Sequence, residues 1–118
     1  MRSLKFLSVI LTLFISFLPL AQSQTQKLTP VPNVEVCMVN DIHFNRPQIP
    51  VNFAGKTYYG CCEMCKTTLA TQASSRMAID PISKKSIDKA SAVIGAKADG
   101  SVVYFENKKN FDKYSSAP

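Results

Sequence analysis

Apolar and polar residues alternate along the first patterned stretch of the chain, which predicts short β-strands. The alternation begins at Val34, continues through Val36 and Met38, and returns at Val51 and Phe53. A period of two residues places successive side chains on opposite faces of a strand. Proline and asparagine at positions 45–50 interrupt the pattern, as expected for a turn between strands.

A hairpin and a helix are predicted to follow. Residues 54–56 (Ala-Gly-Lys) are typical of a tight turn, and residues 57–59 (Thr-Tyr-Tyr) favour a strand. We expect a helix to begin near Cys61 and to run through Thr71 or slightly further.

The second half of the chain repeats this order of elements. When Gly55 is aligned with Gly100, Tyr59 falls on Tyr104, and a turn, a strand at 101–105 and a helix at about 107–114 follow in the same sequence. We therefore predict a small α+β fold of two ββα, treble-clef-like units in pseudo-repeat, packed as one domain.

The predicted units differ in their cysteine content. Residues 34–75 contain all four cysteines, and residues 76–118 contain none. A unit of about 40 residues buries too little apolar surface to be stable alone. We expect the cysteine-free unit to serve as a scaffold that supplies core.

Residues 1–23 have the features of a secretory signal peptide. A basic start is followed by an apolar run at 6–20 and by a small-x-small motif that predicts cleavage after Ser23. The apolar run is shorter than the roughly 20 residues that a membrane-spanning helix needs. We expect a periplasmic or secreted protein without a membrane span in the mature chain, preceded by a flexible lead-in at residues 24–33.

Charge and motif content exclude several classes of function. Loss of Arg2 and Lys5 with the signal peptide would lower the formal net charge from +6 to about +4, and the lysines of the second half, such as Lys89, are dispersed. We expect a solvated lysine-rich face and no nucleic-acid partner. No phosphate-binding loop is present, and the sole histidine, His43, lies in no nucleophile motif, so we expect no enzymatic activity.

The cysteines carry the candidate chemistry. Cys61 and Cys65 are four positions apart and would share one face of a helix, and Cys62 forms a C-x-x-C pair with Cys65. A chain reversal at Gly55 would bring Cys37 alongside them. Three or four converging thiolates, with Cys62 as the fourth candidate ligand, suit zinc or monovalent copper, and the spacing does not select between the two metals.

These motifs resemble the TRASH and YHS families of small cysteine-containing metal-binding domains. The similar stretches are VCMV at 36–39 and GKTYYGCCEMC at 55–65, together with DPIS at 80–83 and GSVVYF at 100–105 in the second unit. The resemblance implies metal ligands at Cys37, Cys61 and Cys65, with Cys62 as an additional cysteine. The corresponding positions in the second unit are Ser83, Glu106 and Asn110.

The expected function is a carrier, buffer or sensor of thiophilic metal ions, with an envelope metal-transport or efflux protein as a partner. Two alternatives remain open at the level of sequence. Four cysteines in an oxidising compartment could form disulfides that staple an envelope interaction module. Cys62 and Cys65 could instead make the chain a thiol redox protein. Met38 and Met64 are expected to fill core, and His43 to be an ordinary, partly exposed histidine.

Overall fold

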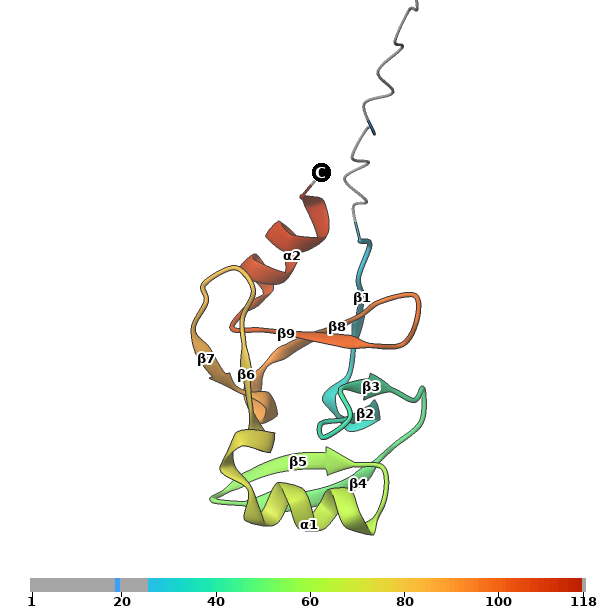
Figure 1. Cartoon of the computed structure of the whole chain (residues 1–118), viewed down its shortest axis with the longest axis vertical. Coiled ribbons are helices and arrows are strands. Elements are labelled where there is room, and N and C mark those ends of the chain that lie inside the picture. The colour runs from blue at the N-terminus through green and yellow to red at the C-terminus, as the bar shows by residue number, and fades with distance from the viewer. Residues whose placement is uncertain (1–18, 20–25, 118) are drawn as a thin grey trace, which may run out of the picture.

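A computed structural model describes residue 19 and residues 26–117, and it confirms a small α+β fold (Figure 1). Except for residue 19, the predicted signal peptide lies outside the described residues. The strands are β1 (Thr29–Val31), β2 (Val36–Cys37), β3 (Ile42–His43), β4 (Ile49–Phe53), β5 (Lys56–Gly60), β6 (Met77–Ile79), β7 (Ser86–Asp88), β8 (Val93–Ala96) and β9 (Val102–Phe105). The helices are α1 (Glu63–Thr71) and α2 (Lys108–Ser116), and 3-10 turns span Asn33–Glu35, Ala73–Arg76 and Lys89–Ser91.

The same order of elements occurs twice, as the sequence predicts. In the first half β2 pairs with β3, β4 pairs with β5, and α1 follows; in the second half β6 pairs with β7, β8 pairs with β9, and α2 follows. Gly55 and Gly100, the two aligned turn glycines, both have positive φ angles, of 75° and 89°. Only glycine adopts this backbone conformation without a steric cost, so the aligned positions share a physical requirement.

The two helices also begin in the same way. Cys62 and Asn107 are the N-cap residues, with φ and ψ of −155° and 173° and of −157° and 170°. Each cap side chain accepts a hydrogen bond from the backbone N–H three residues further on, at Cys65 and at Asn110. The pseudo-repeat thus extends to the local geometry around the cysteines.

The N-terminal segment differs from the predicted flexible lead-in. Residues 29–31 form β1, which pairs antiparallel with β8, and Leu28 is buried against Phe105 and Phe111. The segment contains Pro30 and Pro32, which are typical of a loop, but β1 is the edge strand of the sheet β1-β8-β9. An edge strand tolerates proline because its missing N–H can lie on the unpaired side.

The main hydrophobic core is shared by both halves, which are therefore packed as one domain. The first half contributes Val36, Met38, Val51, Tyr58 and Leu69, and the second contributes Ala92, Ile94 and Tyr104. Each buried aliphatic side chain of this size stabilises the fold by roughly 1.5–3 kcal/mol. Figure 1 shows α1 lying along the β4–β5 hairpin, and α2 packs against β8 and β9.

Polar contacts reinforce this shared core. The Tyr58 hydroxyl donates to the carboxylate of Asp88, and the Tyr104 hydroxyl donates to Asp41, so each half anchors a tyrosine of the other. Lys89, which we expected on a solvated face, is only 5% exposed. Its ammonium group donates to the Met38 carbonyl at 2.6 Å and to Asp41 at 2.8 Å, which offsets the cost of its burial.

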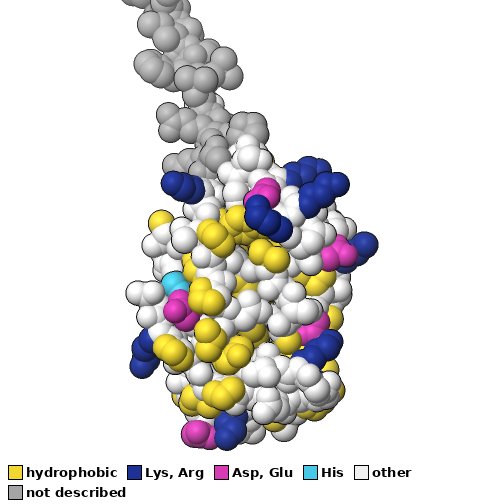
Figure 2. Space-filling view, turned by 180° about the vertical axis from the view of Figure 1, so that it is seen from behind, with side chains coloured by type: hydrophobic (Ala, Val, Ile, Leu, Met, Phe, Trp, Pro, Cys, Tyr) yellow, Lys and Arg dark blue, Asp and Glu magenta, His cyan; other side chains and the backbone are white. Residues whose placement is uncertain are grey.

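The distribution of surface charge and the apolar character of the helices are relevant to the expected lack of nucleic-acid and membrane partners. Lysine and arginine side chains are scattered over the face shown in Figure 2 and form no continuous basic stripe there. Within residues 26–117, no helix combines the length and apolar character needed to cross a bilayer.

Candidate metal centre

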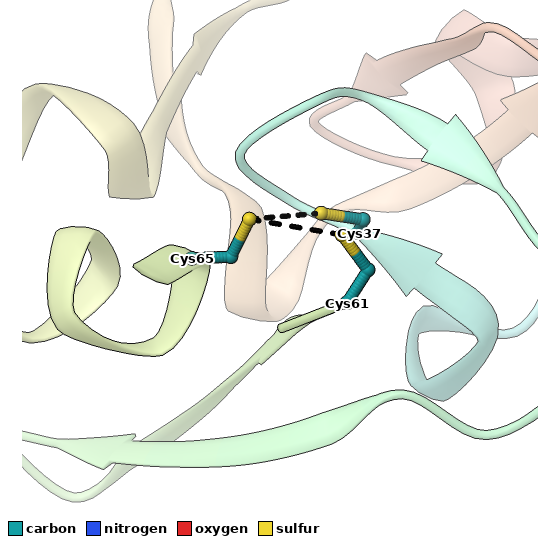
Figure 3. Close-up of side chains that lie close together, drawn as sticks. All are labelled: Cys37, Cys61 and Cys65. Carbon is teal, nitrogen blue, oxygen red and sulfur yellow. Dashed lines mark hydrogen bonds between the residues drawn. The ribbon is translucent and has the colours of Figure 1, made fainter. Parts of the chain in front are cut away.

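Three sulfur atoms from two separate segments of the chain lie close together (Figure 3). The Sγ atoms of Cys37, Cys61 and Cys65 all lie within 4.8 Å of one another, and Cys65 Sγ is 3.9 Å from Cys37 Sγ and 3.7 Å from Cys61 Sγ. Zinc–sulfur bonds of about 2.3 Å in a tetrahedral site place the sulfurs about 3.8 Å apart. Both distances from Cys65 Sγ therefore match the spacing of thiolate ligands around one metal ion.

The turn after β2 positions Cys37. The backbone N–H of Met38 donates to the Tyr59 carbonyl at 2.8 Å, which ties this turn to the strand that ends beside Cys61. On the other side, the buried Lys89 ammonium holds the Met38 carbonyl. The backbone N–H and the carbonyl of Met38 are therefore both hydrogen-bonded, and the partner of the carbonyl, Lys89, belongs to the cysteine-free half.

A glycine allows β5 to end against the first turn of α1. A Cβ atom built on Gly60 would lie 2.9 Å from the Cβ of Cys65 and 3.3 Å from the backbone nitrogen of Lys66. Real Cβ atoms do not approach this closely, so any other residue would push Cys65 away from Cys61.

The fourth cysteine, Cys62, lies next to Cys65 but is not part of the group formed by the sulfurs of Cys37, Cys61 and Cys65. Cys62 is the exposed N-cap of α1, and its Sγ is 3.4 Å from Cys65 Sγ. The helix, predicted to begin near Cys61, begins at Glu63 because Cys62 has an extended backbone and accepts a hydrogen bond from the Cys65 N–H. All four cysteines are free thiols.

The local environment shifts the pKa values of Cys37 and Cys65 in opposite directions. Burial opposes ionisation of Cys37, but hydrogen bonds from the backbone N–H groups of Asn40 and Val39 outweigh it and hold the pKa of Cys37 below its ordinary value. Burial, followed by hydrogen bonding with Cys62 and Cys61, raises the pKa of Cys65 to about 12. A metal ion that binds here at neutral pH must displace at least the Cys65 proton.

The other two thiols shift in opposite directions. Hydrogen bonding with Cys37, followed by burial, raises the pKa of Cys61. The backbone N–H of Cys65 and then its side chain lower the pKa of Cys62. This is the direction expected for a thiol at a helix N-terminus.

A surface cleft lies next to the sulfur group at Cys61. A cleft of about 240 Å³ reaches Cys61 and is lined by Arg46, Pro47, Gln48, Ile49 and Gly60. Of the three cysteines in the sulfur group, only Cys61 lines this cleft.

The remaining candidate ligands lie elsewhere. His43 Nε2 is 2.8 Å from a carboxylate oxygen of Glu35 and is not part of the sulfur group. Met38 is fully buried in the main core, as expected. Met64 is 79% exposed, so the expectation that it fills core is wrong.

In the cysteine-free half, a carboxylate lies at the place that corresponds to the sulfur group of the first half. The residues at the three corresponding positions, Ser83, Glu106 and Asn110, all donate to Asp80: Ser83 and Glu106 through their backbone N–H groups and Asn110 through its side-chain amide. Asp80 is fully buried. Burial raises the pKa of Asp80, but these hydrogen bonds and that of Ile82 outweigh it and lower the pKa below its ordinary value.

The sequence patterns did not predict the roles of Lys89 and Gly60, which position the sulfurs, or of Asp80, which organises the corresponding place in the cysteine-free half. Lys89 was assigned to the surface, since nothing in the sequence marks one lysine of several as buried. Asp80 was noted only as the start of a repeat, although Asp followed by Pro is a signal for a side chain that caps its own turn. Gly60, between an aromatic strand and a cysteine pair, was an available signal for close backbone approach.

Comparisons of the chain with protein-family models, curated protein sequences and solved structures gave no match. The resemblance to TRASH and YHS domains therefore stays a prediction from motifs.

Proposed function

We propose that this chain is an exported, non-enzymatic protein that binds a thiophilic metal ion, zinc or monovalent copper, at Cys37, Cys61 and Cys65. The observation that carries the proposal is the convergence of three sulfurs from a strand end and a helix start within 4.8 Å of one another. Thiolates are ligands that both metals favour.

The number of ligands favours reversible binding over a purely structural role. Structural zinc sites are closed by four protein ligands, whereas a site with three leaves a position for an exchanging group. Here the cleft that Cys61 helps to line is the route by which we expect such a group to approach. A carrier, buffer or sensor needs this exchange, and an envelope metal-transport or efflux protein with its own sulfur ligands is the kind of partner that would take up the ion.

The fold supports binding without a large conformational change. The core shared with the cysteine-free half and the Lys89 contact hold the cysteine turn in place before any ion arrives. Small metal-binding domains that lack such support fold only when the metal binds. Metal exchange in this chain would leave the fold intact.

A metal titration of the reduced full chain tests the proposal. Zinc and monovalent copper are each titrated against a chromophoric chelator, with Cys37→Ser, Cys61→Ser and Cys65→Ser compared with the matched control Cys62→Ser. We expect one ion per chain, a loss of affinity of at least about 100-fold for each of the first three variants, and a change below about threefold for the control. Folding of each variant is checked by circular dichroism. Wild-type affinity in a folded Cys37→Ser variant would overturn the three-sulfur site.

A further inference from the structure

The Cys62–Cys65 pair has a geometry that metal binding alone does not use. Their sulfurs are 3.4 Å apart, closer than either contact that Cys65 makes with the other two cysteines. A disulfide bond measures about 2.05 Å, so a further approach of about 1.4 Å joins them. We expect rotation of the exposed Cys62 side chain to supply most of this approach.

Exposure separates the two partners of this pair. Cys65 is buried, 6% exposed, and would be a metal ligand, whereas Cys62 is exposed and lies outside the three-sulfur group. An external oxidant can therefore reach Cys62 while the metal site is occupied. Once Cys62 is oxidised, the Cys65 sulfur, 3.4 Å away, is the one placed to form a disulfide with it.

We propose that Cys62 is a redox-sensitive release thiol: its oxidation to a disulfide with Cys65 withdraws one of three ligands and frees the metal ion. The inference rests on the proposed function, since it describes how the same site releases its metal ion.

The oxidant we infer is a low-molecular-weight organic disulfide, RSSR. Cys62 gives up its proton and attacks one sulfur of RSSR, which breaks the S–S bond, releases RS⁻ and forms a mixed disulfide on Cys62. The Cys65 sulfur then leaves the metal, attacks Cys62 Sγ and displaces the second RS⁻. The two cysteines lose two electrons and RSSR gains them. The two RS⁻ groups take up the Cys62 proton and one proton from solvent, and the ion is left with only Cys37 and Cys61.

The matched variant is Cys62→Ser. Serine is a good N-cap and can still accept the hydrogen bond from the Cys65 N–H, so α1 keeps its first turn. The variant lacks only the exposed sulfur.

The experiment uses the zinc-loaded full chain, since zinc itself is not oxidised or reduced. Excess oxidised glutathione is added, zinc release is followed with a chromophoric chelator, and disulfides are mapped by peptide mass spectrometry. We expect release from the wild type with a Cys62–Cys65 disulfide, recovery of binding after a reductant, and release at least about tenfold slower from Cys62→Ser.

The outcomes separate this inference from the proposed function. A reduced chain that binds no zinc overturns the proposed function and, with it, any release. If both proteins bind zinc and lose it at the same rate, or if the mapped disulfide joins Cys37 or Cys61 to Cys65, only the role of Cys62 is overturned.

Discussion

Substitution of Asp80 by asparagine tests whether a buried carboxylate takes the structural place of the metal in the cysteine-free half. Oδ1 accepts hydrogen bonds from the N–H groups of Ile82 and Ser83, at 2.7 and 3.1 Å. Oδ2 accepts from the N–H of Glu106 and from the side chain of Asn110, both at 2.8 Å. An asparagine amide presents one oxygen and one NH₂ group, so in either orientation two of the four donors lose their acceptor.

The size of the effect follows from these two lost bonds. A hydrogen bond to a charged group contributes about 1.5–3 kcal/mol, and part of the loss is offset because a buried charge is removed. We expect Asp80→Asn to lower the free energy of unfolding by about 3 kcal/mol and, for a domain of this size, the Tm by about 15 °C. Asp112→Asn is the control: Asp112 forms only an exposed ion pair with Lys108, and its loss costs at most about 0.5 kcal/mol.

The assay is urea and thermal unfolding of the metal-free, reduced chain as a function of pH. Because the pKa of Asp80 is lower in the folded chain than its ordinary value of 3.8, its stabilisation is complete above that pH and is lost as the pH falls through the folded-state pKa. The gap between wild type and Asp80→Asn should therefore narrow below about pH 4. A gap under about 1 kcal/mol at pH 7, or one that does not change with pH, would refute the reasoning.

Two further predictions concern the residues that position the sulfurs. Lys89→Met removes the ammonium group that holds the turn after Cys37, and we expect metal affinity to fall about 10- to 100-fold in a competition titration. Lys56→Met, which removes an exposed partner of Asp88, should leave affinity unchanged. Gly60→Ala inserts a methyl group 2.9 Å from Cys65 Cβ and should weaken metal binding and destabilise the fold by about 1–3 kcal/mol in urea unfolding. Gly55→Ala is strained only by its positive φ and should lose stability without losing affinity, so equal affinity losses in both glycine variants would contradict the steric argument.

Local pattern determined much of the fold. Alternation of apolar residues, turn glycines and the repeated spacing predicted the β4–β5 hairpin, both helices and the order of elements in each half, because these features depend on neighbours within a few residues. The strand expected from Val34 begins at Val36, since residues 33–35 form a 3-10 turn. The edge strand β1 was missed because its partner β8 lies more than 60 residues further along the chain.

For the candidate site, the sequence alone identified the cysteines. Their residue type marks them as metal ligands, and the four-residue spacing of Cys61 and Cys65 places both on one face of a helix. The motif resemblance implied that Cys37 joins Cys61 and Cys65, but it is the tertiary structure that brings these three sulfurs within 4.8 Å of one another and leaves the adjacent Cys62 outside the group. That distinction depends on a long-range hydrogen bond from Met38 to Tyr59, on a lysine from the other half, and on the space that Gly60 leaves open. Such contacts join residues far apart in the chain, and their energies depend on packing that a linear pattern does not contain.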